Sequence, residues 1–242
     1  MKKRSLFIRR NMFPLTGLLL VLFLLSACHK TGNLVNNTPA AGFMAFNLSP
    51  DQSAVTVTLS NNNFTVTPMA FNNYTGDYRP VYIGNRDVAS YDYATSTQLA
   101  TTKQLFEDSA YYSLFVLGAN GKYQNEIVRD NVDSLSSTSG QAYVRYINAI
   151  PDSTQPTVTI SASDAQAFNG NAPFATVSSF KGVTPGDLDI AVTNGSTINA
   201  KRTITTQSGN VYTILISGMP GASDSTQAVQ IKYVKNGIVT AP

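Results

Sequence analysis

An internal repeat restricts the fold of this 242-residue chain more than any other feature. The sequence from Gly42 onward matches the sequence from Gln141 onward, at a spacing of 100 to 102 residues. The clearest matched pairs are Asn47 with Asn148, Pro50 with Pro151, Asp51 with Asp152, Gly84 with Gly186, Tyr112 with Tyr212 and Gly118 with Gly218. Because the spacing changes only where loops are expected, the pattern predicts one domain that has been duplicated.

Each copy reads as a series of short strands separated by turn residues. The runs TVTLS, from Thr56, and TVTIS, from Thr157, alternate polar and apolar side chains, as in a strand with one buried face. The runs AYYSLFVLG and VYTILISG, ending at Gly118 and Gly218, are apolar on both faces and are expected to be central strands. We therefore predict an all-β fold of two tandem antiparallel β-sandwiches.

The predicted sandwiches occupy residues 42–130 and 141–242, and each has about seven strands. The segment 131–140 shows no alternation and ends in a glycine, so it is predicted to be a linker. A linker of this length allows either independent motion of the two domains or a packed interface between them.

Three motifs of the second copy are shared with a known family. The copy opens with AYVRYINAIPD (Ala142–Asp152), continues with a V-x-P-G turn (Val183–Gly186) and closes with VYTILISG (Val211–Gly218). In these motifs it resembles the bacterial domain-of-unknown-function 4397 family, whose repeats occur in secreted and lipid-anchored proteins. The resemblance implies an Ig-like fold and no particular activity. In the first copy Ala45 and Phe46 stand near the positions of the Arg-Tyr pair, so membership of that copy depends on the internal alignment.

The N-terminal segment has the pattern of a secretory signal peptide, with five basic residues before an apolar run at Leu15–Leu25. The run is shorter than the roughly 20 residues that a transmembrane helix needs. It ends in LSAC, which resembles the bacterial lipobox, so we expect cleavage of residues 1–27 and lipidation of Cys28. Residues 28–41 are then a flexible tether, and membrane lipid is the first predicted partner. Cys28 is the only cysteine, which excludes a disulfide within the chain.

Removal of the signal changes the formal net charge from +3 to −2, because five of the 17 basic residues and none of the 14 acidic ones lie in it. The remaining basic residues form no cluster larger than one pair, so nucleic acid is not an expected partner. The predicted location is the cell envelope, with a lipid anchor at the outer membrane. The chain most resembles lipoproteins of the Bacteroidetes, in which an acidic signal after the cysteine is associated with surface display. The first acidic residue here is Asp51, so the sequence does not decide which face of the outer membrane carries the protein.

The sequence lacks the residues that most catalytic and metal sites require. Its single histidine, His29, lies in the tether, so the folded part cannot contain a Ser-His-Asp triad or a typical zinc site. We therefore expect a non-enzymatic protein with no catalytic residue, metal or cofactor. The alternative is a carboxylate-dependent hydrolase of envelope polysaccharide. Its best candidates are Asp187 and Asp189, which share one face of a predicted strand, because the mature chain has only two glutamates, Glu107 and Glu126.

Two polar residues recur in both copies. Asn47 and Asn148 leave a strand before a Pro-Asp turn, where an amide can hydrogen-bond local backbone. A ligand-binding role for them is the alternative. Tyr112 and Tyr212 stand at matched places in a late strand and are predicted to form tyrosine corners, in which the hydroxyl bonds to a preceding loop.

The irregular part of the first copy is a candidate glycan-binding region. Its tyrosines lie near Asn72, Asn73, Asp77 and Asn85, and amphipathic rings beside amides suit carbohydrate hydroxyls. The candidate ligand-binding residues are Tyr74, Tyr78, Tyr82, Tyr91 and Tyr93. The alternative is ordinary packing of these rings at strand edges and in loops.

Four Asp-Ser sequences resemble the three-residue acceptor motif of Bacteroidetes O-glycosylation, and all four lie in predicted loops. The candidate acceptors are Ser109, Ser134, Ser153 and Ser225. The alternative is that loops are simply rich in Asp and Ser.

These features together favour a binding, adhesion or scaffold function at the cell envelope. The predicted partner is a glycan or another envelope protein. It would be bound by loops at the sandwich ends or by pairing at an exposed strand edge.

Overall fold

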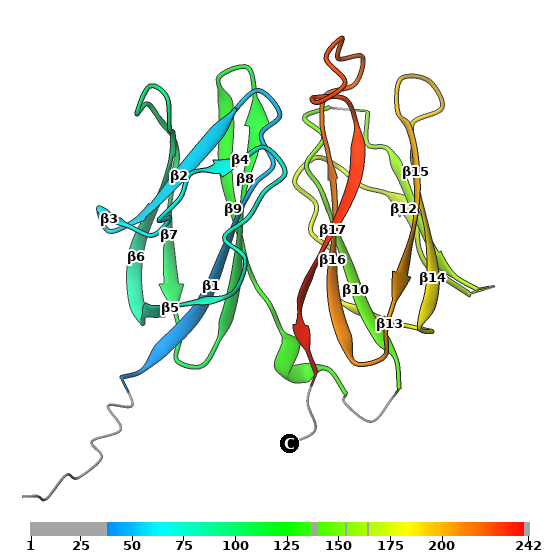
Figure 1. The fold of residues 1–242 in the computed structure, drawn as a ribbon, viewed down its shortest axis with the longest axis horizontal. Coiled ribbons are helices and arrows are strands. Elements are labelled where there is room, and N and C mark those ends of the chain that lie inside the picture. Colours follow the sequence, from blue (N-terminus) through cyan, green and yellow to red (C-terminus); the bar gives the residue numbers. More distant parts are fainter. Residues whose placement is uncertain (1–37, 137–139, 153, 164, 240–242) are drawn as a thin grey trace, which may run out of the picture. The chain divides into compact units, whose positions relative to one another are not determined.

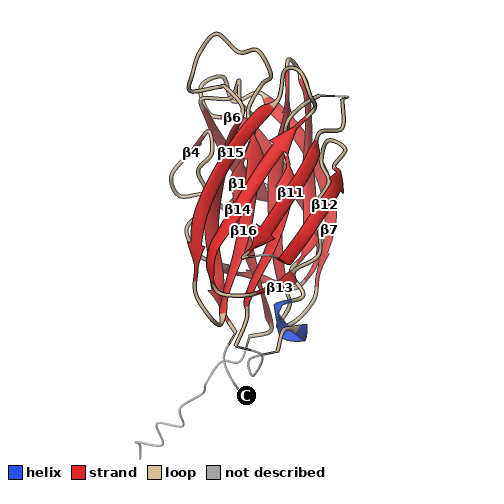
Figure 2. Ribbon diagram, turned by 90° about the vertical axis from the view of Figure 1, so that its right-hand side faces the viewer, coloured by secondary structure: helices blue, strands red, loops and turns tan. Residues whose placement is uncertain are grey.

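The computed structural model describes residues 38–136, 140–152, 154–163 and 165–239 (Figure 1). Strands dominate this part of the chain, and its only helical element is a 3-10 turn at Val132–Ser134 (Figure 2). None of the described helical segments has the length and apolar character needed to cross a bilayer. The predicted all-β fold class is confirmed.

The first repeat forms two facing sheets. Its strands are β1 (Ala40–Asn47), β2 (Ala54–Leu59), β3 (Asn62–Asn63), β4 (Met69–Ala70), β5 (Arg79–Tyr82), β6 (Gly84–Asp92), β7 (Gln98–Phe106), β8 (Tyr111–Ala119) and β9 (Lys122–Arg129). One sheet has the order β5-β1-β8-β9, and the other has the order β3-β2-β6-β7, with β4 paired to β2.

The second repeat has the same sheet order. Its strands are β10 (Ala142–Asn148), β11 (Thr157–Ala162), β12 (Ala165–Asn171), β13 (Lys181–Val183), β14 (Gly186–Thr193), β15 (Asn199–Thr206), β16 (Asn210–Ser217) and β17 (Gln230–Ile238). The sheets are β13-β10-β16-β17 and β12-β11-β14-β15. The matching order confirms the duplicated architecture that the sequence repeat predicts.

One detail differs from the prediction of antiparallel sheets throughout. Strand β1 pairs in parallel with β8, and β10 pairs in parallel with β16, whereas the other strand pairs are antiparallel. The chain leaves β1 at Asn47 for the opposite sheet and returns in the same direction only at β8. A connection of this length can join parallel neighbours, which a short hairpin cannot.

The alternation along β2 and β11 places their apolar residues inside the sandwiches, as predicted. Val55 and Val57 are fully buried in the first core, and Val158 and Ile160 are buried in the second. Burial of such a side chain contributes about 1.5–3 kcal/mol each relative to full exposure.

Strands β1, β8, β10 and β16 are buried on both faces. In β8, Leu114 and Val116 point into the core of the first sandwich, whereas Phe115 and Leu117 belong to a separate apolar cluster that includes residues of the second repeat. The prediction that β8 and β16 are central is confirmed, and each repeat covers the outer face of the other's central strands.

Candidate functional site at the junction of the two repeats

The two repeats share a continuous apolar junction within the compact unit 39–242. Its buried members are Met44, Phe46, Leu48, Phe115, Leu117, Ile147, Ala149, Leu215 and Val234. The rings of Phe46 and Phe115 stack with centroids 4.9 Å apart. Of the two arrangements that the linker allows, the structure has the packed interface.

The junction uses the same face of each repeat. Phe46 of β1 and Leu48, just after this strand, correspond to Ile147 and Ala149 of the second repeat, and all four lie in the shared cluster. Contact of one surface patch with its own copy is the arrangement of a two-fold symmetric dimer. The single chain therefore contains an approximate internal dimer.

A buried ion pair crosses the junction. Arg145 of β10 donates to the carboxylate of Asp130, which follows β9, and the two side chains are only 3% and 0% exposed. Arg145 also donates to the hydroxyls of Ser113, at 3.0 Å, and Thr213, at 2.9 Å. Because a buried charge is tolerated only with its partners, this pair fixes how the repeats meet.

Tyr78 and Asn236 complete the polar network. The hydroxyl of Tyr78 donates to Asp130 and accepts from the Asn236 amide at 3.3 Å. Burial, and next the adjacent Asp130 carboxylate, raise the pKa of Tyr78 above its ordinary value of 10.0. Ser113 donates to Asp130 at 2.6 Å, and Thr213 donates to Asn236 at the same distance. Matched hydroxyls of the two repeats therefore make matched hydrogen bonds.

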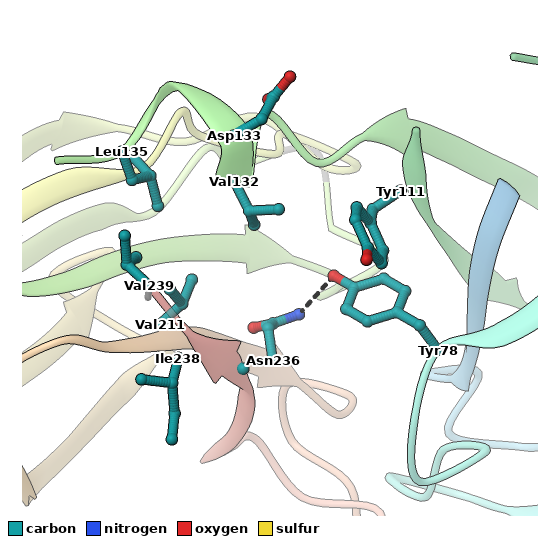
Figure 3. Close-up of a pocket in the computed structure, with 10 residues that line it drawn as sticks. Tyr78, Tyr111, Val132, Asp133, Leu135, Val211, Asn236, Ile238 and Val239 are labelled. Atoms are coloured by element: carbon teal, nitrogen blue, oxygen red, sulfur yellow. Dashed lines mark hydrogen bonds between the residues drawn. The ribbon is translucent and has the colours of Figure 1, made fainter. Parts of the chain in front are cut away.

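A pocket of about 410 Å³ lies beside this network, near the start of β1 (Figure 3). Its lining is mainly apolar around the polar groups of Tyr78 and Asn236, and the Asp133 carboxylate points away from the other lining side chains. The remaining lining residues are Tyr111, Val132, Leu135, Val211, Gly237, Ile238 and Val239. Tyr111 packs edge-on against Tyr78 with ring centroids 5.0 Å apart, which holds one wall in place.

Two grooves lie at the opposite end of β1, and residues of both repeats line each of them. The larger groove, of about 580 Å³, is formed by Pro50, Asp51, Ser53, Ala70, Phe71, Asn72, Asp224, Ser225, Thr226, Gln227, Gln230 and Lys232. The smaller, of about 470 Å³, is formed by Gly118, Ala119, Asn120, Lys122, Pro151, Asp152 and Phe174. We call them the Asp51 groove and the Asp152 groove.

The five candidate tyrosines do not form one platform. Tyr74 stacks on Phe46 at 5.3 Å, so it supports the junction as Tyr78 does. Tyr82 and Tyr93 are exposed by 69% and 59%, but they flank the two ends of β6. Tyr91 lies near the Tyr93 end and donates to Gln98 at 3.4 Å. At about 3.3 Å per residue, the nine-residue β6 separates its ends by roughly 26 Å, too far for one saccharide.

The candidate carboxylates for hydrolysis lie on an outer sheet. Asp187 and Asp189 are exposed on β14 and accept hydrogen bonds from Thr205, at 3.0 Å, and Thr203, at 2.6 Å. Both are therefore held on a solvent-facing sheet surface.

The two glutamates also lie outside the junction network. Glu107 pairs with Arg129 at 2.6 Å on the surface, and burial raises the pKa of Glu126. No group of three or more His, Cys, Asp or Glu with metal-binding geometry occurs among the described residues.

The structural interpretation of the recurring residues is confirmed. Each asparagine accepts from a backbone N–H two residues on, Asn47 from Ser49 and Asn148 from Ile150, at 3.1 Å in both repeats. Asn47 also donates to the Met69 carbonyl at 3.0 Å, and Asn148 donates to the Ala172 carbonyl at 2.7 Å. Both side chains are fully buried, so they anchor a loop in each repeat.

The tyrosine corners are also confirmed. The hydroxyl of Tyr112 accepts from the backbone N–H of Glu107 at 3.3 Å. The hydroxyl of Tyr212 accepts from that of Gln207 at 3.2 Å. In each repeat the bond therefore joins the late strand to the loop that precedes it.

Three of the four candidate glycosylation sites can be placed. Ser109 and Ser225 lie in exposed turns, and Ser134 is exposed in the 3-10 turn. Ser153 and the lipidation site Cys28 lie outside the described residues. Modification of these residues stays a prediction.

The fold and the junction define the chain as a tandem-repeat β-sandwich protein. It belongs to the DUF4397 family, described as a domain of unknown function, whose model matches residues 42–153 and 142–233. The match to the first copy confirms the membership that the internal alignment implies. No curated protein matches the chain.

Proposed function

We propose that the mature protein is a non-enzymatic lipoprotein of the bacterial cell envelope, anchored through acylated Cys28, that binds a glycan or an envelope protein. Its type is that of the Bacteroidetes lipoproteins, and the expected membrane is the outer one. The observation that carries the proposal is the buried junction, because it joins the two repeats into a single unit with binding grooves made from both.

The position of the grooves supports a partner-binding role. Strand β1 includes the last two residues of the predicted tether, Ala40 and Ala41, and ends at Asn47, shortly before Asp51. At about 3.3 Å per residue, the strand separates its ends by roughly 23 Å. A chain anchored ahead of Ala40 would hold the Asp51 and Asp152 grooves away from its attachment point. A partner would have access to the grooves at that end of the strand.

Lipid attachment is tested in cells grown with an alkyne fatty acid, which labels acylated proteins. The wild-type chain is expected to carry the label and to sediment with membranes, and Cys28→Ala is expected to lose both properties. Equal labelling of wild type and variant would refute the lipoprotein assignment.

Partner binding is tested by protease shaving of intact cells and by chemical crosslinking. Digestion of the second repeat in intact cells would place the grooves outside the cell, and protection until the outer membrane is opened would place them in the periplasm. Crosslinking in the same cells is expected to capture a glycan or a protein at the groove residues. Absence of any crosslinked partner at either location would contradict the binding role.

A further inference from the structure

We propose that the Asp51 groove is a binding site for a neutral saccharide. The inference rests on the proposed binding function and names its ligand class and its residues. It differs from the tyrosine platform expected from the sequence, because the residues involved are Asp51, Phe71 and Asn72, together with the polar wall of the second repeat.

Two unpartnered polar atoms mark this groove. Among the described residues that are not exposed, only three buried side-chain oxygen or nitrogen atoms have no hydrogen-bond partner, and two of them belong to Asp51 and Asn72. Asp51 Oδ1 is an acceptor, and Asn72 Nδ2 is a donor. An unsatisfied buried polar group is unfavourable to the fold, so its retention beside a groove indicates a ligand group that satisfies it.

The second repeat provides an internal comparison. Asn72 donates its backbone N–H to the Asn47 carbonyl at 2.8 Å, and Ala175 makes the equivalent bond to Asn148 at the same distance. Both residues have left-handed backbone, with φ of 62° and 66°. Since alanine is less suited to this conformation than asparagine, yet occupies it in the second repeat, the backbone of the loop does not require asparagine. The amide oxygen of Asn72 accepts from the Ser217 hydroxyl at 2.5 Å across the junction, and its Nδ2 has no partner.

The Asp152 groove lacks the two unpartnered atoms. The carboxylate of Asp152 accepts from the backbone N–H of Thr154 at 2.9 Å and from its hydroxyl at 2.8 Å. Phe174 corresponds to Phe71, but Ala175 stands at the position of Asn72 and has no side-chain amide. The duplicated architecture therefore accounts for the aromatic ring and the turn. It does not account for the two unpartnered atoms, Asp51 Oδ1 and Asn72 Nδ2. The other oxygen of Asp51 accepts from the Asn120 N–H at 2.7 Å and the Tyr123 hydroxyl at 2.8 Å.

The chemistry of the Asp51 groove suits sugar hydroxyls. A hydroxyl both donates and accepts, so adjacent hydroxyls can donate to Asp51 and accept from Asn72, while Phe71 offers an apolar ring. The carboxylates of Asp51 and Asp224 outweigh the single cation of Lys232, which disfavours an anionic ligand. A volume of about 580 Å³ lies within the roughly 300–1,000 Å³ of small-molecule pockets.

The mature chain without its lipid, beginning at His29, is the sample for a test by NMR. The ¹⁵N-labelled protein is titrated separately with glucose, galactose, mannose, xylose, fucose and N-acetylglucosamine to about 100 mM, which detects millimolar Kd values. At least one sugar is expected to shift the side-chain amide of Asn72 and the backbone amides of Asp51 and Phe71. The residues of the Asp152 groove should not shift.

Substitutions separate this site from weak binding elsewhere. Asn72→Ala introduces the residue that the second repeat carries and is expected to weaken the binding of that sugar about tenfold, the effect of about 1.4 kcal/mol. Asp51→Asn removes the charge at nearly constant size and should also weaken it. Asp152→Asn is the matched control in the other groove and should leave it unchanged. Well-dispersed spectra of all three variants establish that they fold.

Three results would overturn the inference. These are no shift with any of the six sugars, equal shifts in both grooves, and binding that Asn72→Ala does not change. A protein crosslinked at the grooves in cells, together with no sugar response in solution, would refute the saccharide site and leave the envelope-binding role standing. Absence of acyl labelling on the wild-type chain, or equal labelling of wild type and Cys28→Ala, would refute the anchor without affecting the titration.

Discussion

Substitution of Arg145 by methionine tests the view that the ion pair holds the two repeats together. Methionine stands at the equivalent position of the first repeat, as Met44, where it packs in the shared apolar cluster. The substitution leaves Asp130 buried, with the hydroxyls of Ser113 and Tyr78 but no cation. Loss of one member of a buried pair destabilises a protein by about 3–5 kcal/mol.

The predicted loss is large enough to measure by calorimetry and by urea unfolding of the lipid-free chain. For a unit of about 200 residues, each kcal/mol corresponds to roughly 2–4 °C, so Tm should fall by about 6–20 °C. The weakened junction should also allow the two repeats to unfold in separate transitions, which appear as a second calorimetric peak.

A second substitution makes the argument quantitative. Asn236 corresponds to Asp130, and it accepts from Thr213 as Asp130 accepts from Ser113. Adding Asp130→Asn to the Arg145→Met chain removes the unpaired charge and should recover most of the lost stability, because neutral replacements of buried pairs are often tolerated. A loss below about 1 kcal/mol for Arg145→Met, or a double variant no more stable than the single one, would refute the reasoning.

Three further predictions concern single residues. The pKa of Tyr78 is raised in the folded chain, so the stability that its protonated hydroxyl gives the fold is complete below pH of about 10 and is lost as pH rises above that value. Urea midpoints measured between pH 8 and 11 should therefore fall less steeply for Tyr78→Phe than for the wild type. Identical slopes would contradict this. Tyr212→Phe removes the corner hydroxyl and should cost about 1 kcal/mol in thermal unfolding, whereas Tyr82→Phe, on an exposed ring, should cost almost nothing. Gly118→Ala would place Cβ 2.0 Å from a backbone carbonyl oxygen at φ of 107° and should destabilise the chain by more than about 2 kcal/mol. Gly121→Ala, at φ of 77° with open space around it, should cost about 1 kcal/mol. Equal costs for the two substitutions would show that the close contact at Gly118 is unimportant.

The parts of the structure that the sequence predicts are those set by neighbours in the chain. Tyr112 reaches a backbone N–H only five residues away, and Asn47 accepts from Ser49 in the next turn. Strand alternation and the duplication are equally readable, because a pleated strand repeats every two residues and each copy contains the same elements.

The junction depends on contacts that no local pattern specifies. Two sequence signals for it do exist: strands with apolar residues on both faces, and Arg145, a cation inside the apolar run AYVRYIN. A charge in such a strand requires a buried partner, but its identity, Asp130, depends on how the repeats pack.

The candidate tyrosines do not form one binding platform, for a related reason. Tyr82 and Tyr91 are close in sequence, but an extended strand places its ends far apart. The Asp51 groove combines residues separated by more than 170 positions, so sequence proximity could not indicate it.

The parallel pairing of β1 with β8 has a mechanical consequence. A pull between Ala40 and a partner held by the second-repeat wall of the Asp51 groove must pass from β1 into the rest of the molecule, and it acts along β1. The hydrogen bonds that join β1 to β8 lie across that direction at six successive residue pairs, so they share the load instead of opening one after another. Detachment of β1 then requires these hydrogen bonds to break together. The rate of forced unfolding therefore sets how long a molecule under load stays bound to its partner.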